Sequence, residues 1–245
     1  MLEVRGLTKQ FGALRASDGI DFDVAEGETH AVIGPNGAGK TTFIGQLAGN
    51  LRPDSGTVRF AGTDITALPA PRRARLGLAR SFQITSVYPD FSVLQNVALA
   101  IQAHSGHSFR FWRDARNDPR LIEPARQVLD ELGLSSRLAV LAANLSHGEQ
   151  RQLEVAIALA TAPRLLLLDE PMAGMGIEES QRMIALLASL KGRHTIILVE
   201  HDMDAVFRLA DRISVLVYGR LIATGTPESI RANEEVRRAY LGTEA

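Results

Sequence analysis

The sequence contains the stretch Gly34-Pro35-Asn36-Gly37-Ala38-Gly39-Lys40-Thr41-Thr42, which fits the pattern G-x-x-x-x-G-K-[ST]. An apolar run over residues 30–33 leads into it, and a helix-compatible run over residues 43–48 follows. Such a strand–loop–helix unit turns successive backbone N–H groups and the positive end of a helix toward one point, where a polyphosphate fits. The stretch therefore predicts a nucleoside triphosphate site rather than a plain glycine-rich turn.

Residue types in this loop suit the task of holding phosphates. Glycines at positions 34, 37 and 39 allow positive φ and a close approach of the backbone to the ligand. Lys40 is expected to reach the β- and γ-phosphates, and the Thr41 hydroxyl to hold Mg²⁺. The predicted nucleotide contacts are Gly34, Pro35, Asn36, Gly37, Ala38, Gly39, Lys40, Thr41 and Thr42.

Two later apolar runs end in polar residues. Residues 165–168 lead into Asp169-Glu170, and residues 195–199 lead into Glu200-His201. Ligands of parallel sheets bind at the carboxyl ends of strands, and neighbouring strand residues point to opposite faces. Asp169 is therefore expected to hold Mg²⁺. Glu170 is expected to orient or deprotonate the attacking water, although a pair of plain surface acids is the alternative.

His201 follows the second of these runs, where its side chain can hydrogen-bond a γ-phosphate; a purely structural histidine is the alternative. The other five histidines have no metal-ligand spacing. Phe11 precedes Gly12 near the N-terminus, and its ring is available either to stack on a nucleobase or to pack in the protein.

Composition limits the remaining possibilities. The 245 residues suit one large α/β domain or two closely joined subdomains, and the formal net charge of -1 implies no general attraction to nucleic acid. The chain has no cysteine, so disulfides, thiolate metal sites and a cysteine nucleophile are excluded. We expect no signal peptide and no membrane span, so work at a membrane requires another chain to do the spanning.

Alternation predicts half-buried strands over residues 2–8 and 20–24 and a hairpin over 57–60 and 63–65, which together form an antiparallel layer. Further strands are expected at 78–82, 165–168, 195–199, 213–217 and 221–224, and helices at 93–100, 121–132, 146–160, 178–190, 203–210 and from Thr226 to Leu241. An insert over residues 104–119 reads as a surface loop; a docking patch on Phe109, Phe111 and Trp112 is the alternative.

The ordered motifs resemble those of one family, the nucleotide-binding subunits of ATP-binding-cassette (ABC) transporters. They comprise Phe11, the Walker A stretch Gly34–Thr42, Gln83 as the Q-loop, Leu145-Ser146-His147-Gly148-Glu149 as the signature, residues 165–170 as Walker B, and His201 as the switch histidine. The resemblance extends from about residue 2 to residue 225. It implies an α/β P-loop NTPase with a RecA-like parallel sheet core, an antiparallel β subdomain and an α-helical subdomain.

The resemblance also implies a single ATPase domain over residues 1–245. In it, about 1–83 and 161–225 form the catalytic core with the β subdomain, about 84–160 the helical subdomain with the signature, and about 226–245 a helical tail. The implied cofactors are ATP and Mg²⁺. The implied catalytic residues are Glu170, His201 and Gln83, and the implied metal ligands are Thr41, Gln83 and Asp169.

A head-to-tail dimer follows from the same resemblance. In it, Ser146, Gly148 and Glu149 of one subunit lie at the ATP held by the other, although Ser146 and Glu149 also read simply as a helix capping box. Two departures from the family pattern are present: His147 and Glu149 replace a Gly and a Gln of the common signature, and Gly176 stands at the usual aspartate of the D-loop.

Several stretches are similar to the larger ATPase subunit of branched-chain amino-acid importers, among them residues 78–83, 146–151 and 199–203. Importers of urea or short amides are the near alternative. The implied partners are a second ATPase (identical or a sister chain), transmembrane permease subunits and, indirectly, a substrate-binding protein, at the cytoplasmic face of the membrane.

A cassette ATPase acting on nucleic acid lacks support here, since the chain has no coiled coil, second cassette or basic surplus. A small-molecule kinase is also disfavoured, because its reaction does not require the signature motif.

Overall fold

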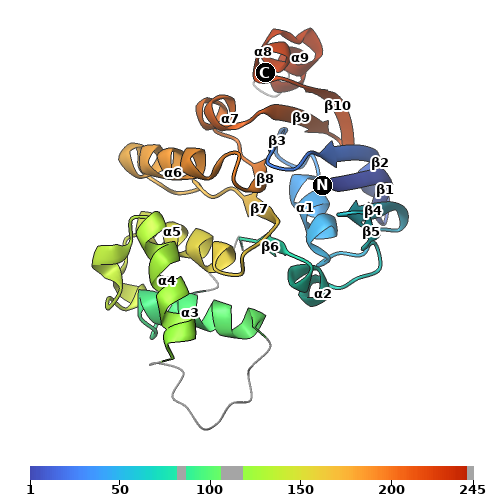
Figure 1. The fold of residues 1–245 in the computed structure, drawn as a ribbon. Coiled ribbons are helices and arrows are strands. Elements are labelled where there is room, and N and C mark those ends of the chain that lie inside the picture. The colour runs from blue at the N-terminus through green and yellow to red at the C-terminus, as the bar shows by residue number, and fades with distance from the viewer. Residues whose placement is uncertain (82–86, 106–117, 242–245) are drawn as a thin grey trace.

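The computed structural model describes residues 1–81, 87–105 and 118–241, without the side chains of residues 240 and 241. Two sheets organise the chain (Figure 1). A six-stranded sheet has the order β10-β9-β3-β8-β7-β6, and a four-stranded sheet has the order β2-β1-β4-β5. The strands are β1 (Leu2–Phe11), β2 (Leu14–Val24), β3 (Thr29–Ile33), β4 (Ser55–Phe60), β5 (Thr63–Asp64), β6 (Leu78–Arg80), β7 (Leu165–Asp169), β8 (Thr195–Val199), β9 (Arg212–Val217) and β10 (Arg220–Gly225).

Five neighbouring strands of the larger sheet, β9, β3, β8, β7 and β6, are parallel, and only β10 pairs antiparallel. Every residue of β3, β7 and β8 is buried, as expected for strands that are covered on both faces. In register, Val32 and Asp169 both lie opposite Val199. The carboxyl ends of β3, β7 and β8 therefore meet at one edge of the sheet.

The helices are α1 (Lys40–Ala48), α2 (Ala70–Arg75), α3 (Val93–His104), α4 (Pro119–Glu131), α5 (His147–Leu159), α6 (Ile177–Leu190), α7 (Met203–Leu209), α8 (Pro227–Ala232) and α9 (Glu234–Leu241), with 3₁₀ turns at Ser135–Arg137 and Ala142–Asn144. Within the described residues, none of them is both long and apolar enough to cross a membrane.

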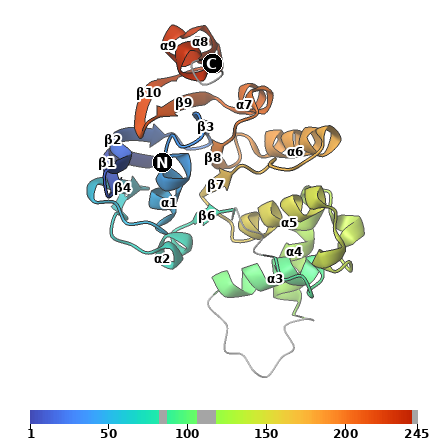
Figure 2. The same ribbon diagram turned by 180° about the vertical axis from the view of Figure 1, so that it is seen from behind.

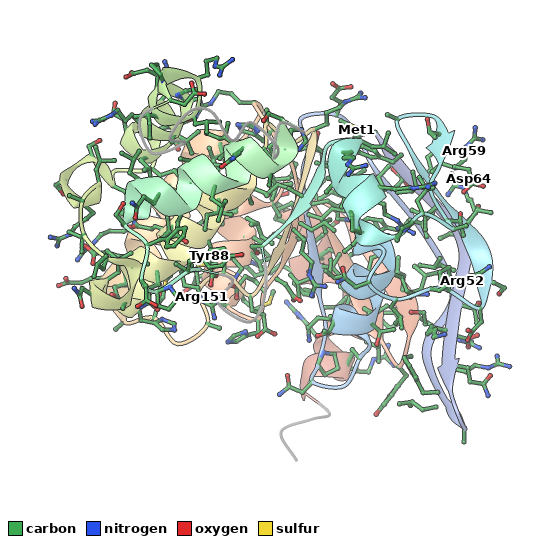
Figure 3. All side chains as sticks on the ribbon, turned by 90° about the horizontal axis from the view of Figure 1, so that it is seen from below. Met1, Arg52, Arg59, Asp64, Tyr88 and Arg151 are labelled. Atoms are coloured by element: carbon green, nitrogen blue, oxygen red, sulfur yellow. The ribbon has the colours of Figure 1, made fainter. Side chains whose placement is uncertain are left out.

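The antiparallel sheet covers α1 on one side. Residues of β1, β2 and β4 share a buried cluster with α1 and with β3, β7 and β8, and the Phe22 ring meets the Phe43 ring edge-on at 5.2 Å. Strands β4 and β5 form the predicted hairpin, with Arg59 opposite Asp64 (Figure 3). The predicted antiparallel layer is confirmed, and it holds the helix that follows the phosphate loop.

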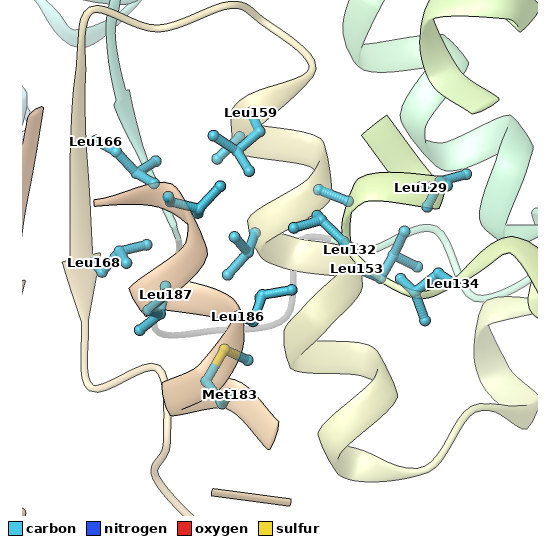
Figure 4. Packing of buried hydrophobic residues seen from close by; sticks show 14 of the residues in the cluster. Leu129, Leu132, Leu134, Leu153, Leu159, Leu166, Leu168, Met183, Leu186 and Leu187 are labelled. Carbon is cyan, nitrogen blue, oxygen red and sulfur yellow. The ribbon is translucent and has the colours of Figure 1, made fainter. Parts of the chain in front are cut away.

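Helices α3, α4 and α5 form a lobe beside the larger sheet, seen from both sides in Figures 1 and 2. Helix α5 joins this lobe to the sheet because its apolar side chains belong to one cluster with residues of α4, α6 and β7 (Figure 4). Leu153 of α5, for example, is completely buried. A movement of α5 is therefore transmitted to both the lobe and the sheet.

Most predicted elements are present, with differences at their ends and two errors. Helix α3 extends to His104 rather than ending at residue 100. The short helix α2 was not predicted. The tail is two helices rather than one, because Asn233 Oδ1 accepts the N–H groups of Glu235 and Val236 and thereby caps a new helix. The insert residues Phe109, Phe111 and Trp112 lie outside the described residues.

Arg73 of α2 closes the far end of the phosphate-loop helix. Its side chain donates to the carbonyl oxygens of Gln46 and Leu47 at 2.7 Å, at the C-terminus of α1, and to those of Thr66 and Leu68 at 3.0 and 2.8 Å. Only 1% of Arg73 is exposed, and this burial lowers its pKa to about 10 against the opposing charge of Asp64. The buried cation is satisfied by carbonyls, including the negative end of a helix.

We predict that Arg73→Met lowers the free energy of unfolding by on the order of 3 kcal/mol, because four buried or half-buried carbonyl oxygens lose the Arg73 donor. Urea denaturation measures the change. Arg72→Met is the matched control, since Arg72 is the exposed neighbour on the same helix and its loss should change stability by less than about 0.5 kcal/mol. Equal effects of the two substitutions would contradict the assigned role of Arg73.

Candidate functional site

The phosphate loop connects β3 to α1 in a conformation that requires glycine at two places. A Cβ at Gly34 would overlap the Leu216 carbonyl oxygen, and one at Gly39 would overlap the Ala16 carbonyl oxygen. Gly39 also has φ 105°, in the left-handed region, as the residue before α1. Because α1 begins at Lys40, the N–H groups of its first turn have no acceptor within the helix and remain available to an anion.

Lys40 lies across its own loop. Its Nζ donates to the carbonyl oxygens of Gly34 at 2.6 Å and Pro35 at 3.0 Å, and only 8% of the residue is exposed. Burial lowers the pKa of Lys40, and the charges of Glu170 and Asp169 oppose that effect. The loop lysine and the two carboxylates at the end of β7 therefore share one electrostatic environment. Thr41 is exposed at the start of the helix, where its hydroxyl is accessible to a ligand.

The two carboxylate oxygens of Asp169 differ in their hydrogen bonding. Its Oδ2 accepts from Arg80 Nη2 at 2.9 Å, whereas Oδ1 is buried and has no hydrogen-bond partner within the described residues. Burial raises the pKa of Asp169, and the neighbouring Arg80 guanidinium acts against this. A buried carboxylate oxygen without a partner is costly unless a ligand completes it, so this oxygen suits a cation.

Glu170 is in a backbone conformation that L-residues rarely adopt, with φ 50°. Its N–H donates to the Val199 carbonyl at 2.9 Å, and its own carbonyl accepts from the Ala173 N–H at 3.1 Å. These two bonds hold the turn that ends β7 and fix the direction in which the partly exposed side chain leaves the sheet. Strained backbone of this kind is frequent at functional sites.

His201 follows β8 and its side chain is 64% exposed, with Nδ1 at 3.7 Å from Glu200 Oε2. The neighbouring Glu200 is 1% exposed. Its Oε1 accepts from the Met172 N–H at 3.0 Å and its Oε2 from the His201 N–H at 3.1 Å, so one carboxylate ties the segment after Glu170 to the start of the histidine loop. Burial raises the pKa of Glu200, and these N–H groups oppose the increase.

Other predicted site residues lie elsewhere or are not described. Phe11 is 48% exposed at the end of β1, with Lys9 Nζ 5.5 Å from its ring centre. Gln83 lies outside the described residues. Ser146 begins α5 with the predicted capping box: Ser146 Oγ accepts the Glu149 N–H, and Glu149 Oε2 accepts the Ser146 N–H. The other oxygen of Glu149 accepts from Arg137 at 2.6 Å, so Glu149 fixes the start of α5.

Within the described part of the chain, Ser146 and Gly148 contact α6 and not the phosphate loop. Ser146 Oγ and the Gly148 N–H both donate to Glu179 Oε1, each at 3.3 Å. Sequence analysis assigned no role to Glu179, Glu200 or Arg80. The only hint of a role for Glu200 and Arg80 was their position near a strand end. Their partners Met172 and Asp169 are 28 and 89 residues away along the chain, so no local pattern marks these contacts.

The chain is similar in sequence to known proteins over nearly its whole length. A family model described as "ABC transporter" matches residues 17–173, and one described as "Branched-chain amino acid ATP-binding cassette transporter" matches residues 220–245. The chain is 39% identical over 249 residues to the high-affinity branched-chain amino acid transport ATP-binding protein BraF of Pseudomonas aeruginosa, covering 99% of this chain and 98% of that protein. It is 37% identical over 254 residues to LivG of Escherichia coli K12, with the same coverage.

Solved structures agree with the sequence comparison. An ATP-binding cassette of an ABC transporter in its ADP conformation superimposes with a TM-score of 0.87 at 28% identity, over 99% of this chain and 98% of that one. A nucleotide-free cassette superimposes with a TM-score of 0.86 at 28% identity, over 98% of each chain.

We predict that Glu200→Gln lowers the free energy of unfolding by about 1–3 kcal/mol, because the new NH₂ group faces an N–H donor and cannot accept its bond. ATP hydrolysis should slow as well, since the segments carrying Glu170 and His201 lose a shared anchor. Thermal melting and a phosphate-release assay measure the two effects. Glu178→Gln is the control because the Glu178 side chain is 87% exposed. Unchanged stability and unchanged hydrolysis would contradict the anchoring role.

Proposed function

The chain belongs to the ABC transporter family of ATP-binding subunits and is an ATPase, and from this premise we propose how its residues carry out the reaction and what it transports. The observation that carries the proposal is the convergence of Lys40, Asp169 and Glu170 at the carboxyl edge of the parallel sheet. ATP binds with its phosphates in the loop of residues 34–42, where Lys40 and the N–H groups of α1 neutralise their charge. Phe11 stacks on the base.

The residues present fit Mg²⁺. Asp169 offers Oδ1, which is buried and has no hydrogen-bond partner among the described residues. Thr41 offers an exposed hydroxyl, and Gln83 is the third proposed ligand. The described residues contain no group of three or more His, Cys, Asp or Glu side chains that would hold a metal alone. This suits Mg²⁺, which takes few protein ligands and is completed by phosphates and water. When bound, the ion neutralises charge that develops on the phosphates.

Glu170 orients and deprotonates the attacking water, and His201 hydrogen-bonds the γ-phosphate. The left-handed backbone at Glu170 aims the carboxylate out of the sheet beside Asp169, while Glu200 holds the His201 loop against the same segment. Phosphoryl transfer needs mainly position and charge neutralisation from a protein, and these residues supply both.

Completion of the site requires a second cassette. Ser146 and Gly148 contact Glu179 within their own chain, so their donors reach a triphosphate only when another subunit presents one. We therefore place ATP between the loop of one subunit and the α5 N-terminus of the other. The partner is a second copy of this chain or a sister ATPase.

A groove of mixed polarity on the helical lobe supports a membrane-embedded partner. Its lining includes Phe91, Leu99, Leu121 and Ile122 together with Asp90, Gln95 and Gln102. Phe91 is 40% exposed, and its ring centre lies 5.4 Å from that of the neighbouring Tyr88, which is 56% exposed. We propose that a cytoplasmic segment of a permease docks here, so that the chain lies on the inner face of the membrane.

The domain division follows from these assignments. Residues of about 1–83 and 161–225 form the catalytic core with the β subdomain, about 84–160 form the helical subdomain that meets the permease, and about 226–245 form the tail. The relatives named for branched-chain amino-acid transport, and the matching tail model, support these amino acids as the cargo. We propose that the complete transporter is an importer that works with a substrate-binding protein.

Glu170→Gln should retain ATP binding and slow hydrolysis by about 10²–10⁴-fold, which corresponds to about 3–5 kcal/mol of barrier. Nucleotide binding by fluorescence and steady-state phosphate release measure the two properties. In the same variant, Mg-ATP should convert monomer into dimer, as seen by sedimentation. The control Glu178→Gln should hydrolyse ATP normally. Near-normal turnover of Glu170→Gln would remove Glu170 from its role.

The cargo is tested by purifying the complete transporter through this chain and identifying the molecule on its substrate-binding protein by mass spectrometry. We expect leucine, isoleucine or valine. Cargo-stimulated ATP hydrolysis in proteoliposomes, with the same amino acids added to the binding protein, should confirm the coupling. Urea or a short amide on the binding protein would contradict the branched-chain assignment and leave the ATPase assignment intact.

A further inference from the structure

The carboxylate of Glu179 occupies the two donors that the proposed function assigns to a partner's ATP. Ser146 Oγ and the Gly148 N–H both donate to Glu179 Oε1, at 3.3 Å each. The contact is close: a Cβ on Gly148 would stand 2.7 Å from this oxygen. An anionic group belonging to the chain itself therefore sits at the positive end of α5.

The hydroxyl of Ser146 is oriented by this arrangement. Its oxygen accepts the Glu149 N–H at 3.2 Å as the cap of α5, so its proton is free to point to Glu179. A γ-phosphate at α5 would use the same proton and the same Gly148 N–H. The carboxylate and the phosphate carry like charges, so both cannot occupy these donors together.

Glu179 is held loosely. Its hydrogen bonds to Ser146, Gly148 and Gly176 measure 3.3, 3.3 and 3.4 Å, longer than the 2.7–2.9 Å typical of charge-assisted bonds. The third of these bonds lies at the start of α6, where Glu179 Oε2 accepts the N–H of Gly176, the residue before the helix. If the carboxylate leaves α5, its hydrogen bond to Gly176 changes too, and with it the segment between Glu170 and α6.

We propose that Glu179 is an intramolecular stand-in for the γ-phosphate, which satisfies the signature donors in the separate subunit and must be displaced before ATP closes the dimer. The inference rests on the proposed contact of Ser146 and Gly148 with ATP held by a second subunit. Glu179 thus opposes closure, and through Gly176 it links the α5 end of one ATP site to the Glu170 segment of its own chain. No other charged group in the described residues contacts both helices in this way.

The test compares ATP-driven dimerisation of Glu170→Gln with that of the double variant Glu170→Gln/Glu179→Gln. Glutamine is nearly the same size but has one carbonyl oxygen, which can accept either from Ser146 and Gly148 or from Gly176. The substitution therefore removes the negative charge and weakens one of these two interactions. Sedimentation at fixed Mg-ATP should give a dimer dissociation constant at least about fivefold lower for the double variant. The gain should shrink as salt is added, since it is electrostatic.

Glu170→Gln/Glu178→Gln is the matched control. It removes the same charge one position earlier on α6, where Glu178 is exposed and pairs only with Arg182 among the described residues. Its dissociation constant should match that of Glu170→Gln within about twofold. Melting of the nucleotide-free monomers shows whether each variant is folded.

The outcomes separate the two proposals. A dimer of the Glu179→Gln double variant that is unchanged or weaker, while Glu170→Gln still dimerises with ATP, overturns the inference and leaves the proposed function standing. An equal gain in the Glu178 control also overturns it, because general charge reduction would then suffice. Failure of Glu170→Gln itself to dimerise with ATP overturns the proposed pairing of this chain with itself.

Discussion

The site depends on the register of the parallel sheet. Because β3 and β7 both pair with β8 in parallel, the phosphate loop, the carboxylates after β7 and the histidine after β8 leave the sheet at the same edge. The charges collected there are unfavourable singly: burial lowers the pKa of Lys40 and raises that of Asp169. Opposite charges offset each cost: Glu170 and Asp169 oppose the shift at Lys40, and Arg80 opposes the shift at Asp169 more than Lys40 does.

Buried charged side chains join elements that the sheet alone does not connect. Arg73 closes the C-terminus of α1, Arg80 holds Asp169 from the neighbouring strand, and Glu200 holds the segment after β7. Each pairs with a complementary charge, a carbonyl group or an N–H group, as buried ions must. The phosphate-loop helix is thus fixed at its far end by Arg73, while its first turn remains open to ligand.

The ordered motifs predicted the fold class, which the solved structures confirm, and a candidate site whose residue roles stay predictions. Short stretches of sequence were enough to predict features formed by neighbouring residues. Examples are the loop before Lys40, the leucine strand before Asp169 and the capping box at Ser146. Contacts between distant residues were not predicted, since nothing in the chain marks Arg80 as the partner of Asp169. The tail was misjudged for a local reason: the periodicity of its apolar residues continues across Asn233, whose side chain nevertheless starts a new helix. Gln83 lies outside the described residues, so its role stays a prediction.

An ATPase that works by association has to keep its separate subunit folded without letting it close early. The first turn of α5 must present free donors to a phosphate, yet unpaired donors at a partly buried helix end destabilise the subunit. A nearby carboxylate on a different helix resolves this conflict, because it pairs the donors through long bonds that a more highly charged phosphate can replace. Since that carboxylate also caps its own helix next to Gly176, the exchange at α5 changes the segment that leads back to Glu170. Gly176 is compatible with this arrangement, because the carboxylate that accepts its N–H belongs to Glu179, three residues later.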